Sequence, residues 1–322
     1  MEVFKLTLFQ MITMFLLIVS GYVLRKKNIL PEESHITLSR LETYILVPAL
    51  NIINWTDNCT PQTLKENSVL VLYGGIIIAV AVALAYPLSA LFVRNRKTPA
   101  DEYQRNIYKY AMTFGNYGFV GNYIILGVFG NEMFFKYSMF CIIVAFVCSS
   151  WGLIILIPKD QGKVMSFKNM MRTFLSPPII GLLIGMVIGL CNLKSYMPTF
   201  LTTALSNAGN CMGPIAMILA GFVIGGFNFK SLVTKPKVYV ASLFRLVFIP
   251  AFGVGILKLL GASYDICVLT LILLATPLGM NTIVYPAAYG GDFRTGASMT
   301  LVSSTLAVAT IPLMYLLFIV IL

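Results

Sequence analysis

Amides and glycines inside an apolar stretch are the residues of this chain best suited to bind a ligand. Residues 113–132, TFGNYGFVGNYIILGVFGNE, contain Asn116, Gly118, Gly121 and Asn122. A glycine destabilises a helix interior by about 1 kcal/mol relative to alanine, and lipid offers no water to a freed backbone group, so a broken helix survives only where protein or a cavity covers it. The cluster predicts an interrupted helix with amides available to a ligand. Close packing of helices is the alternative explanation of the glycines.

A second stretch repeats this pattern. In residues 274–292, LATPLGMNTIVYPAAYGGD, Pro277 and Pro286 flank Asn281 and Thr282, and proline removes a helix hydrogen bond. Two interrupted helices at matching places in two halves of a chain are typical of a transporter's binding site. The N-termini of the half-helices would favour an anionic or carbonyl-bearing solute. Two ordinary proline kinks are the alternative.

Other chemistry has little support in the sequence. His35 is the only histidine, and the six cysteines show no metal-ligand spacing. No Ser-His-Asp set and no phosphate-binding loop is present, so we expect neither enzymatic activity nor a metal or cofactor. Most carboxylates lie in loops or at segment ends; Glu42 is the exception and is expected to pair with Arg40. Arg245 lies inside an apolar segment and is expected to snorkel to the membrane surface.

The elements that position these residues are membrane-spanning helices. Of the 322 residues 58% are hydrophobic and only 11% are charged, against roughly 25% charged in soluble domains. A spanning helix needs about 20 apolar residues. Ten segments qualify: 4–24, 37–55, 68–93, 108–129, 134–157, 173–191, 201–226, 238–258, 264–288 and 296–321. The fold class predicted is an all-α integral membrane protein.

The distribution of lysines and arginines indicates how the chain is oriented in the membrane. The net charge is +11, which invites a nucleic-acid partner. With both termini placed outside the cell membrane, however, 18 of the 23 lysines and arginines fall on the inner side and five on the outer side. This bias follows the positive-inside rule. We therefore expect a multi-pass protein with extracytoplasmic termini and no nucleic-acid partner.

The chain divides into two halves of five segments. The polar stretch 158–171 lies between the fifth and sixth segments, and halves with an odd number of spans cross the membrane in opposite senses. FGNE at 129–132 matches YGGD at 289–292 in order and position. The predicted organisation is a first repeat over 1–157, a cytoplasmic linker over 158–171 and a second, inverted repeat over 172–322.

Several longer stretches, in this order, resemble the auxin efflux carrier family in its short bacterial form. They are GYVLRKKNILPEESHITLSRLETYILVPAL (21–50), FGNYGFVGNYIILGVFG (114–130), PPIIGLLIG (177–185), MGPIAMILAGFVIG (212–225), RLVFIPAFG (245–253) and ATPLGMNTIVYPAAYGGD (275–292). The resemblance covers essentially the whole chain.

This resemblance implies a fold and a transport mechanism. The first, second, sixth and seventh helices would form a scaffold, often a dimer interface, and the other six a moving, elevator-like transport domain. The fourth and ninth helices would be interrupted, cross at mid-membrane and hold a small carboxylate such as malate, malonate or auxin. The polar contacts to the substrate are expected from Asn116, Asn122, Tyr123, Asn281 and Thr282. The backbone of the site is expected to be shaped by Gly118, Gly121 and Pro277.

Two positions depart from the family pattern, and other functions stay open. Tyr123 follows Gly121 and Asn122 where the family often has proline, and Thr282 stands where plant members have proline. Tyr123 is expected to narrow the pocket or to contact a carboxylate. The main alternative is a sodium-coupled organic anion symporter resembling the bile-acid carriers, which would need a cluster of interior Gln, Glu and Asn. A membrane receptor or an intramembrane enzyme is a further alternative.

Overall fold

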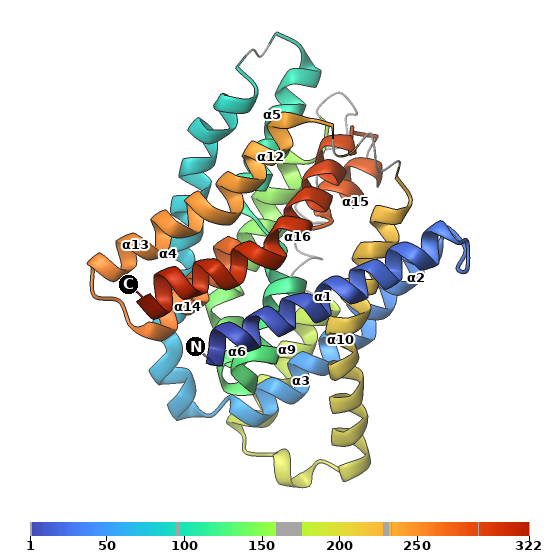
Figure 1. Ribbon diagram of the computed structural model, residues 1–322. Helices are drawn as coiled ribbons and strands as arrows, with labels where there is room; N and C mark the ends of the chain where they lie inside the picture. Colours follow the sequence, from blue (N-terminus) through green and yellow to red (C-terminus); the bar gives the residue numbers. More distant parts are fainter. Residues whose placement is uncertain are drawn as a thin grey trace.

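The computed structural model describes residues 2–94, 97–158, 176–227, 232, 234–288 and 290–321, and these are helical nearly throughout (Figure 1). The first half of the chain forms α1 (Glu2–Lys26), α2 (Ser34–Leu41), η1 (Glu42–Leu46), α3 (Val47–Asn58), α4 (Pro61–Phe92), α5 (Pro99–Thr113), η2 (Tyr117–Gly121), α6 (Asn122–Val147), η3 (Cys148–Gly152) and α7 (Leu153–Ile155). The second half forms α9 (Pro177–Leu190), η5 (Lys194–Tyr196), α10 (Thr199–Gly225), α12 (Pro236–Leu243), η6 (Phe244–Phe248), α13 (Ile249–Leu259), α14 (Tyr264–Ala275), α15 (Asn281–Ala288), α16 (Arg294–Tyr315) and η7 (Leu316–Ile321). Among these, η5 is a 3₁₀ turn and the other η segments are π-helical turns.

The predicted all-helical class agrees with the structure, since the described residues contain no strand. Within them, seven helices are long and apolar enough to cross a membrane, and α9 and α14 are shorter apolar helices. The Pro99–Ile155 stretch counts as one of the seven, although it holds two predicted segments. Gly130, with φ 81° and ψ −171°, divides it inside α6. The fold is therefore that expected of an integral membrane protein.

Part of the predicted organisation falls outside the described residues. The predicted linker 158–171 does so apart from Pro158. The same holds for six of the basic residues on which the predicted orientation rests: Arg96, Lys159, Lys163, Lys168, Arg172 and Lys230.

Two helix pairs pack closely through glycine: α1 packs on α10, which it crosses in Figure 1, and α3 packs on α9. A Cβ atom on Gly221 of α10 would overlap the carbonyl oxygen of Ile18 of α1, and one on Gly21 would overlap that of Ile218. Gly189 of α9 faces the carbonyl of Cys59 beside α3 in the same way. Small residues of this kind let helix backbones approach each other in a membrane. The two pairs are joined where α10 also packs on α3.

The change Gly221→Ala is expected to weaken the α1–α10 pair. The added methyl group would meet the backbone of Ile18, which cannot rotate away, and overpacking of this kind costs about 1–3 kcal/mol. Thermal unfolding of the purified protein should show a lower midpoint. Gly255→Ala in α13 is the matched control because no atom lies within 4 Å of its Cβ position. Equal midpoints for the two variants would contradict the packing argument.

The remaining long helices form a second group. In the first half of the chain α4 packs on α5 and α6, and in the second half α13 packs on α14 and α12 on α16. The interrupted segments of the fourth and ninth predicted helices lie in this group, between α5 and η2 and between α14 and α15.

Candidate functional site

The first interruption lies at residues 114–116. Helix α5 ends at Thr113, Phe114 is extended (φ −114°, ψ 130°), and η2 begins at Tyr117. A helix is thus broken in the predicted stretch without a proline. The break precedes Gly118, so Gly118 and Gly121 lie within η2, and Asn122 and Tyr123 lie within α6.

The second interruption lies at residues 276–280. Helix α14 ends at Ala275, Thr276 is extended (φ −65°, ψ 143°), and α15 begins at Asn281. Pro277 stands in the interruption, whereas Pro286 lies within α15. The missing backbone donor of Pro277 fits a stretch that has left the helix.

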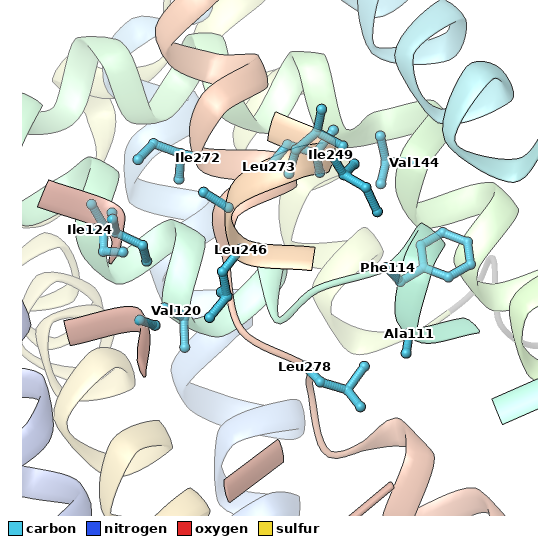
Figure 2. Packing of buried hydrophobic residues seen from close by; sticks show 14 of the residues in the cluster. Ala111, Phe114, Val120, Ile124, Val144, Leu246, Ile249, Ile272, Leu273 and Leu278 are labelled. Atoms are coloured by element: carbon cyan, nitrogen blue, oxygen red, sulfur yellow. The ribbon is translucent and has the colours of Figure 1, made fainter. Parts of the chain in front are cut away.

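The two interruptions meet. The backbone N–H of Asn116 donates a hydrogen bond to the carbonyl of Pro277 at 2.6 Å. A Cβ atom on Gly279 would lie 3.4 Å from the Cα of Asn116, so the two backbones are in contact. Apolar side chains surround this meeting point: Figure 2 shows Val120 and Ile124 of the first broken helix in one packed cluster with Leu278 of the second and residues of the neighbouring elements.

Arg245 of η6 points into the meeting point, and the prediction that it snorkels to the surface is wrong. Its side chain is 1% exposed. Nη1 donates to the carbonyls of Met112 (3.3 Å) and Thr113 (3.2 Å), Nη2 to Leu273 (3.1 Å) and Nε to Thr276 (3.4 Å). One guanidinium therefore serves the C-terminal ends of both α5 and α14, where helix carbonyls have no partner of their own.

A cavity of about 740 Å³ lies beside the first interruption. The N-terminal turn of the half-helix opens to it through Gly118 and Asn122, and no atom lies within 4 Å of the Cβ position of Gly118. The other lining side chains are mostly apolar and come from α3 and α9 on one side and from α4, α6 and η3 on the other. They include Val47, Asn51, Trp55, Ser68, Ser138, Met139, Ile142, Phe146, Ser149, Ile179, Leu182 and Met186. Cavities of this size that are mostly apolar, with a few polar groups, are typical sites for small organic ligands.

Three of the expected first-half residues, Asn116, Gly121 and Tyr123, do not line this cavity. The backbone N–H of Asn116 bonds the carbonyl of Pro277 instead. A Cβ atom on Gly121 would overlap the hydroxyl of Tyr137, whose O–H donates to the carbonyl of Tyr117 at 3.2 Å. The ring of Tyr123 packs over Gly213 of α10, and the Tyr123 carbonyl accepts a hydrogen bond from Gln10 Nε2 at 3.2 Å. Gly121 and Tyr123 thus contact protein neighbours.

The expected second-half residues make contacts inside the protein. Asn281 Nδ2 donates to the Tyr110 hydroxyl at 2.7 Å, and that hydroxyl lies 3.3 Å from Cys148 Sγ. Thr282 is fully buried, and its hydroxyl donates to the carbonyl of Gly279 at 3.2 Å. Asn281 and Thr282 therefore hold the second half-helix against α5 and its own loop.

Sequence reasoning missed the contribution of α3 and α9 to the cavity and the role of Arg245. Asn51 and Trp55 lie in one apolar segment at i and i+4, a spacing that places them on one helix face. That spacing was the available signal for α3. For Arg245 the signal was its position well inside an apolar segment, where an ionisable residue usually faces the protein interior.

The predicted pairing of Glu42 with Arg40 is wrong. Glu42 is 1% exposed, and its Oε1 has no hydrogen-bond partner among the described residues. Arg40 is exposed. Two residues at i and i+2 on a helix point in different directions, so they do not face each other.

Two interrupted helices that meet beside a cavity are a common feature of secondary transporters. Residues 6–315 match the membrane transport protein family, which includes the auxin efflux carriers. The chain belongs to this family. The resemblance drawn from the sequence motifs is thereby confirmed.

Two archaeal relatives align with almost the whole of this chain. An uncharacterized transporter of Methanocaldococcus jannaschii is 24% identical over 300 residues, which are 92% of this chain and 94% of the relative. An uncharacterized transporter of Methanothermobacter thermautotrophicus is 24% identical over 306 residues, 94% and 95% of the two chains. This membrane transport protein is accordingly a multi-pass membrane protein of a transporter family.

Proposed function

We propose that this protein is a secondary transporter that exports small organic anions, in particular carboxylates with an apolar body. The observation that carries the proposal is the opening of the η2 N-terminus into the cavity at Gly118 and Asn122. The N–H groups of the first turn have no partner inside the helix, and the positive end of the helix dipole favours an anion. The Asn122 amide adds a hydrogen-bond donor, and the apolar walls suit an auxin-like acid better than a small dicarboxylate.

We further propose ten spanning helices in two inverted repeats of five, over 1–157 and 172–322. Backbone features recur in both halves. Asn28 after α1 and Asn192 after α9 are the two non-glycine residues with positive φ in the described chain, at 52° and 53°. Gly130 and Gly290, which follow the two interrupted helices, also have positive φ, at 81° and 72°. The pairing of α1 with α10 and of α3 with α9 has the form that a two-fold axis between the repeats would produce.

An elevator mechanism follows from this division. The scaffold would comprise α1, α2 with α3, α9 and α10, and would pair in a homodimer. The transport domain would comprise the other helices. The cavity is lined from both groups, so a substrate bound there would touch the fixed and the moving part. Movement of the transport domain would carry it from the inner to the outer side of the cell membrane, with both termini outside and no enzymatic step.

A thermal-shift screen with malate, malonate, benzoate and indole-3-acetate tests the substrate class. A ligand that binds only the folded protein raises the unfolding midpoint by mass action. We expect shifts for benzoate and indole-3-acetate, and none for their uncharged amides. Shifts of equal size for acids and amides would contradict recognition of a carboxylate.

The change Asn122→Ala is expected to weaken binding of these acids by roughly tenfold or more, because a hydrogen bond to a charged group contributes about 1.5–3 kcal/mol. Titration of the thermal shift measures the affinity. Asn281→Ala is the matched control, since Asn281 bonds Tyr110 and does not line the cavity. Retention of wild-type affinity by Asn122→Ala would remove Asn122 from the site.

A further inference from the structure

The feature that carries a further inference is the group of carbonyls around Arg245. Four backbone oxygens lie within 3.1–3.4 Å of its guanidinium nitrogens, two from the last turn of α5 and two from the end of α14 and the residue after it. These helix ends, Thr113 of α5 and Ala275 of α14, belong to different halves of the chain, and 162 positions separate them (275 minus 113). A single side chain from a third element, η6, thus joins them.

Two helix C-termini that meet in an apolar interior need positive charge between them. Each carries the negative end of a helix dipole and carbonyls without intrahelical partners, and lipid supplies no water to satisfy them. In transporters with interrupted helices, unwound carbonyls and half-helix C-terminal ends often coordinate a coupling Na⁺. The same ligands converge here on a group that belongs to the protein.

Arginine is suited to replace such an ion. Its planar guanidinium presents five donors and stays protonated in proteins, so it satisfies both helix ends at once. The space around it is filled. A Cβ atom on Gly115 would lie 2.5 Å from Arg245 Nη2 and equally close to the Thr276 carbonyl.

We infer that Arg245 is a permanent counter-cation of the crossing, which takes the place of a coupling Na⁺, so that transport does not require sodium. The part concerning transport rests on the proposed function; the part concerning the helix ends does not. The Arg245 guanidinium thus distinguishes this protein from a sodium-coupled symporter, in which comparable helix ends bind Na⁺.

The test compares unfolding midpoints of the full-length protein in NaCl and in choline chloride at equal ionic strength, without substrate. The wild-type midpoint should be the same in both salts. Arg245→Ala should unfold roughly 5 °C lower or more, because several buried carbonyls lose their donors. About 10 mM methylguanidinium chloride should restore part of that loss, since it offers the same planar set of donors to the carbonyls that Arg245 leaves.

Two variants complete the test. Arg245→Lys keeps the charge but cannot span both helix ends, so an intermediate midpoint is expected, which also provides a reading if Arg245→Ala does not fold. Arg40→Ala removes an exposed arginine and should show neither loss nor rescue. A sodium-dependent wild-type midpoint, an unchanged Arg245→Ala midpoint, or a loss that neither methylguanidinium nor Na⁺ restores would each overturn the inference.

Transport itself is measured in proteoliposomes with the acid that gives the largest thermal shift. Uptake should proceed equally when choline replaces sodium on both sides, and a requirement for sodium would overturn the inference. If none of the acids binds while the midpoints behave as described, the proposed substrate class fails and the role of Arg245 stands.

Discussion

A leucine in place of Gly118 is expected to abolish carboxylate binding while the protein stays folded. The Cβ position of Gly118 faces open space, so a side chain there would extend into the cavity and cover the N-terminal turn of the half-helix. We expect the affinity for indole-3-acetate to fall by roughly a hundredfold, the equivalent of about 2.7 kcal/mol. The thermal shift with this acid measures the loss.

Two controls test whether unfolding, or a leucine at any open glycine position, accounts for the loss of binding. The ligand-free midpoint of Gly118→Leu should remain near that of the wild type, because no neighbour is displaced. Gly255→Leu, at another open position in α13, should retain full binding. A Gly118→Leu protein that binds the acid normally would show that the ligand lies elsewhere.

Gly115→Ala is expected to disrupt the contact between the two interrupted helices. The added methyl group would overlap the Thr276 side chain and lie 2.5 Å from its carbonyl oxygen and from Arg245 Nη2. Neither group can retreat without breaking hydrogen bonds, so we expect a loss near the upper end for overpacking, about 3 kcal/mol. For a chain of this size, with an unfolding entropy of about 2.1 cal/mol/K per residue, that lowers the unfolding midpoint by roughly 4–5 °C.

Gly118→Ala is the matched control for this change. It makes the same substitution three residues later, where the Cβ position is open, and should leave the midpoint within a degree or two of the wild type. Comparable midpoints for the two alanine variants would mean that the crossing is looser than its contacts indicate.

The existence of the two interruptions was predictable from sequence, whereas the position of the first was not. Glycines, amides and prolines mark both stretches because each weakens a helix locally. The family pattern pointed to the region of Gly121 and Tyr123, yet the helix ends at Thr113. The break lies where the Asn116 N–H finds the Pro277 carbonyl, a partner 161 residues away that no local pattern reveals.

The predictions for Arg245 and Glu42 were wrong although the sequence held a signal against each. Arg245 lies well inside an apolar segment, where an ionisable residue usually faces the protein interior, and residues two apart on a helix, such as Arg40 and Glu42, do not face each other. The carbonyl partners of Arg245 could not be predicted, because they come from two helix ends distant in the sequence. The cavity walls were also unpredictable in detail, because they depend on how α3 and α9 lie against α4 and α6.

The position of Arg245 also bears on how the chain enters the membrane during synthesis. A central arginine raises the free energy of inserting a helix by about 2.5–3.5 kcal/mol. Its carbonyl partners at Met112 and Thr113 emerge from the ribosome more than 130 residues earlier, but those at Leu273 and Thr276 emerge later. The segment from Pro236 to Leu259 must therefore enter the membrane before all partners of Arg245 have been synthesised. Arg245 reaches its final buried position only after insertion, when the later helices pack against it.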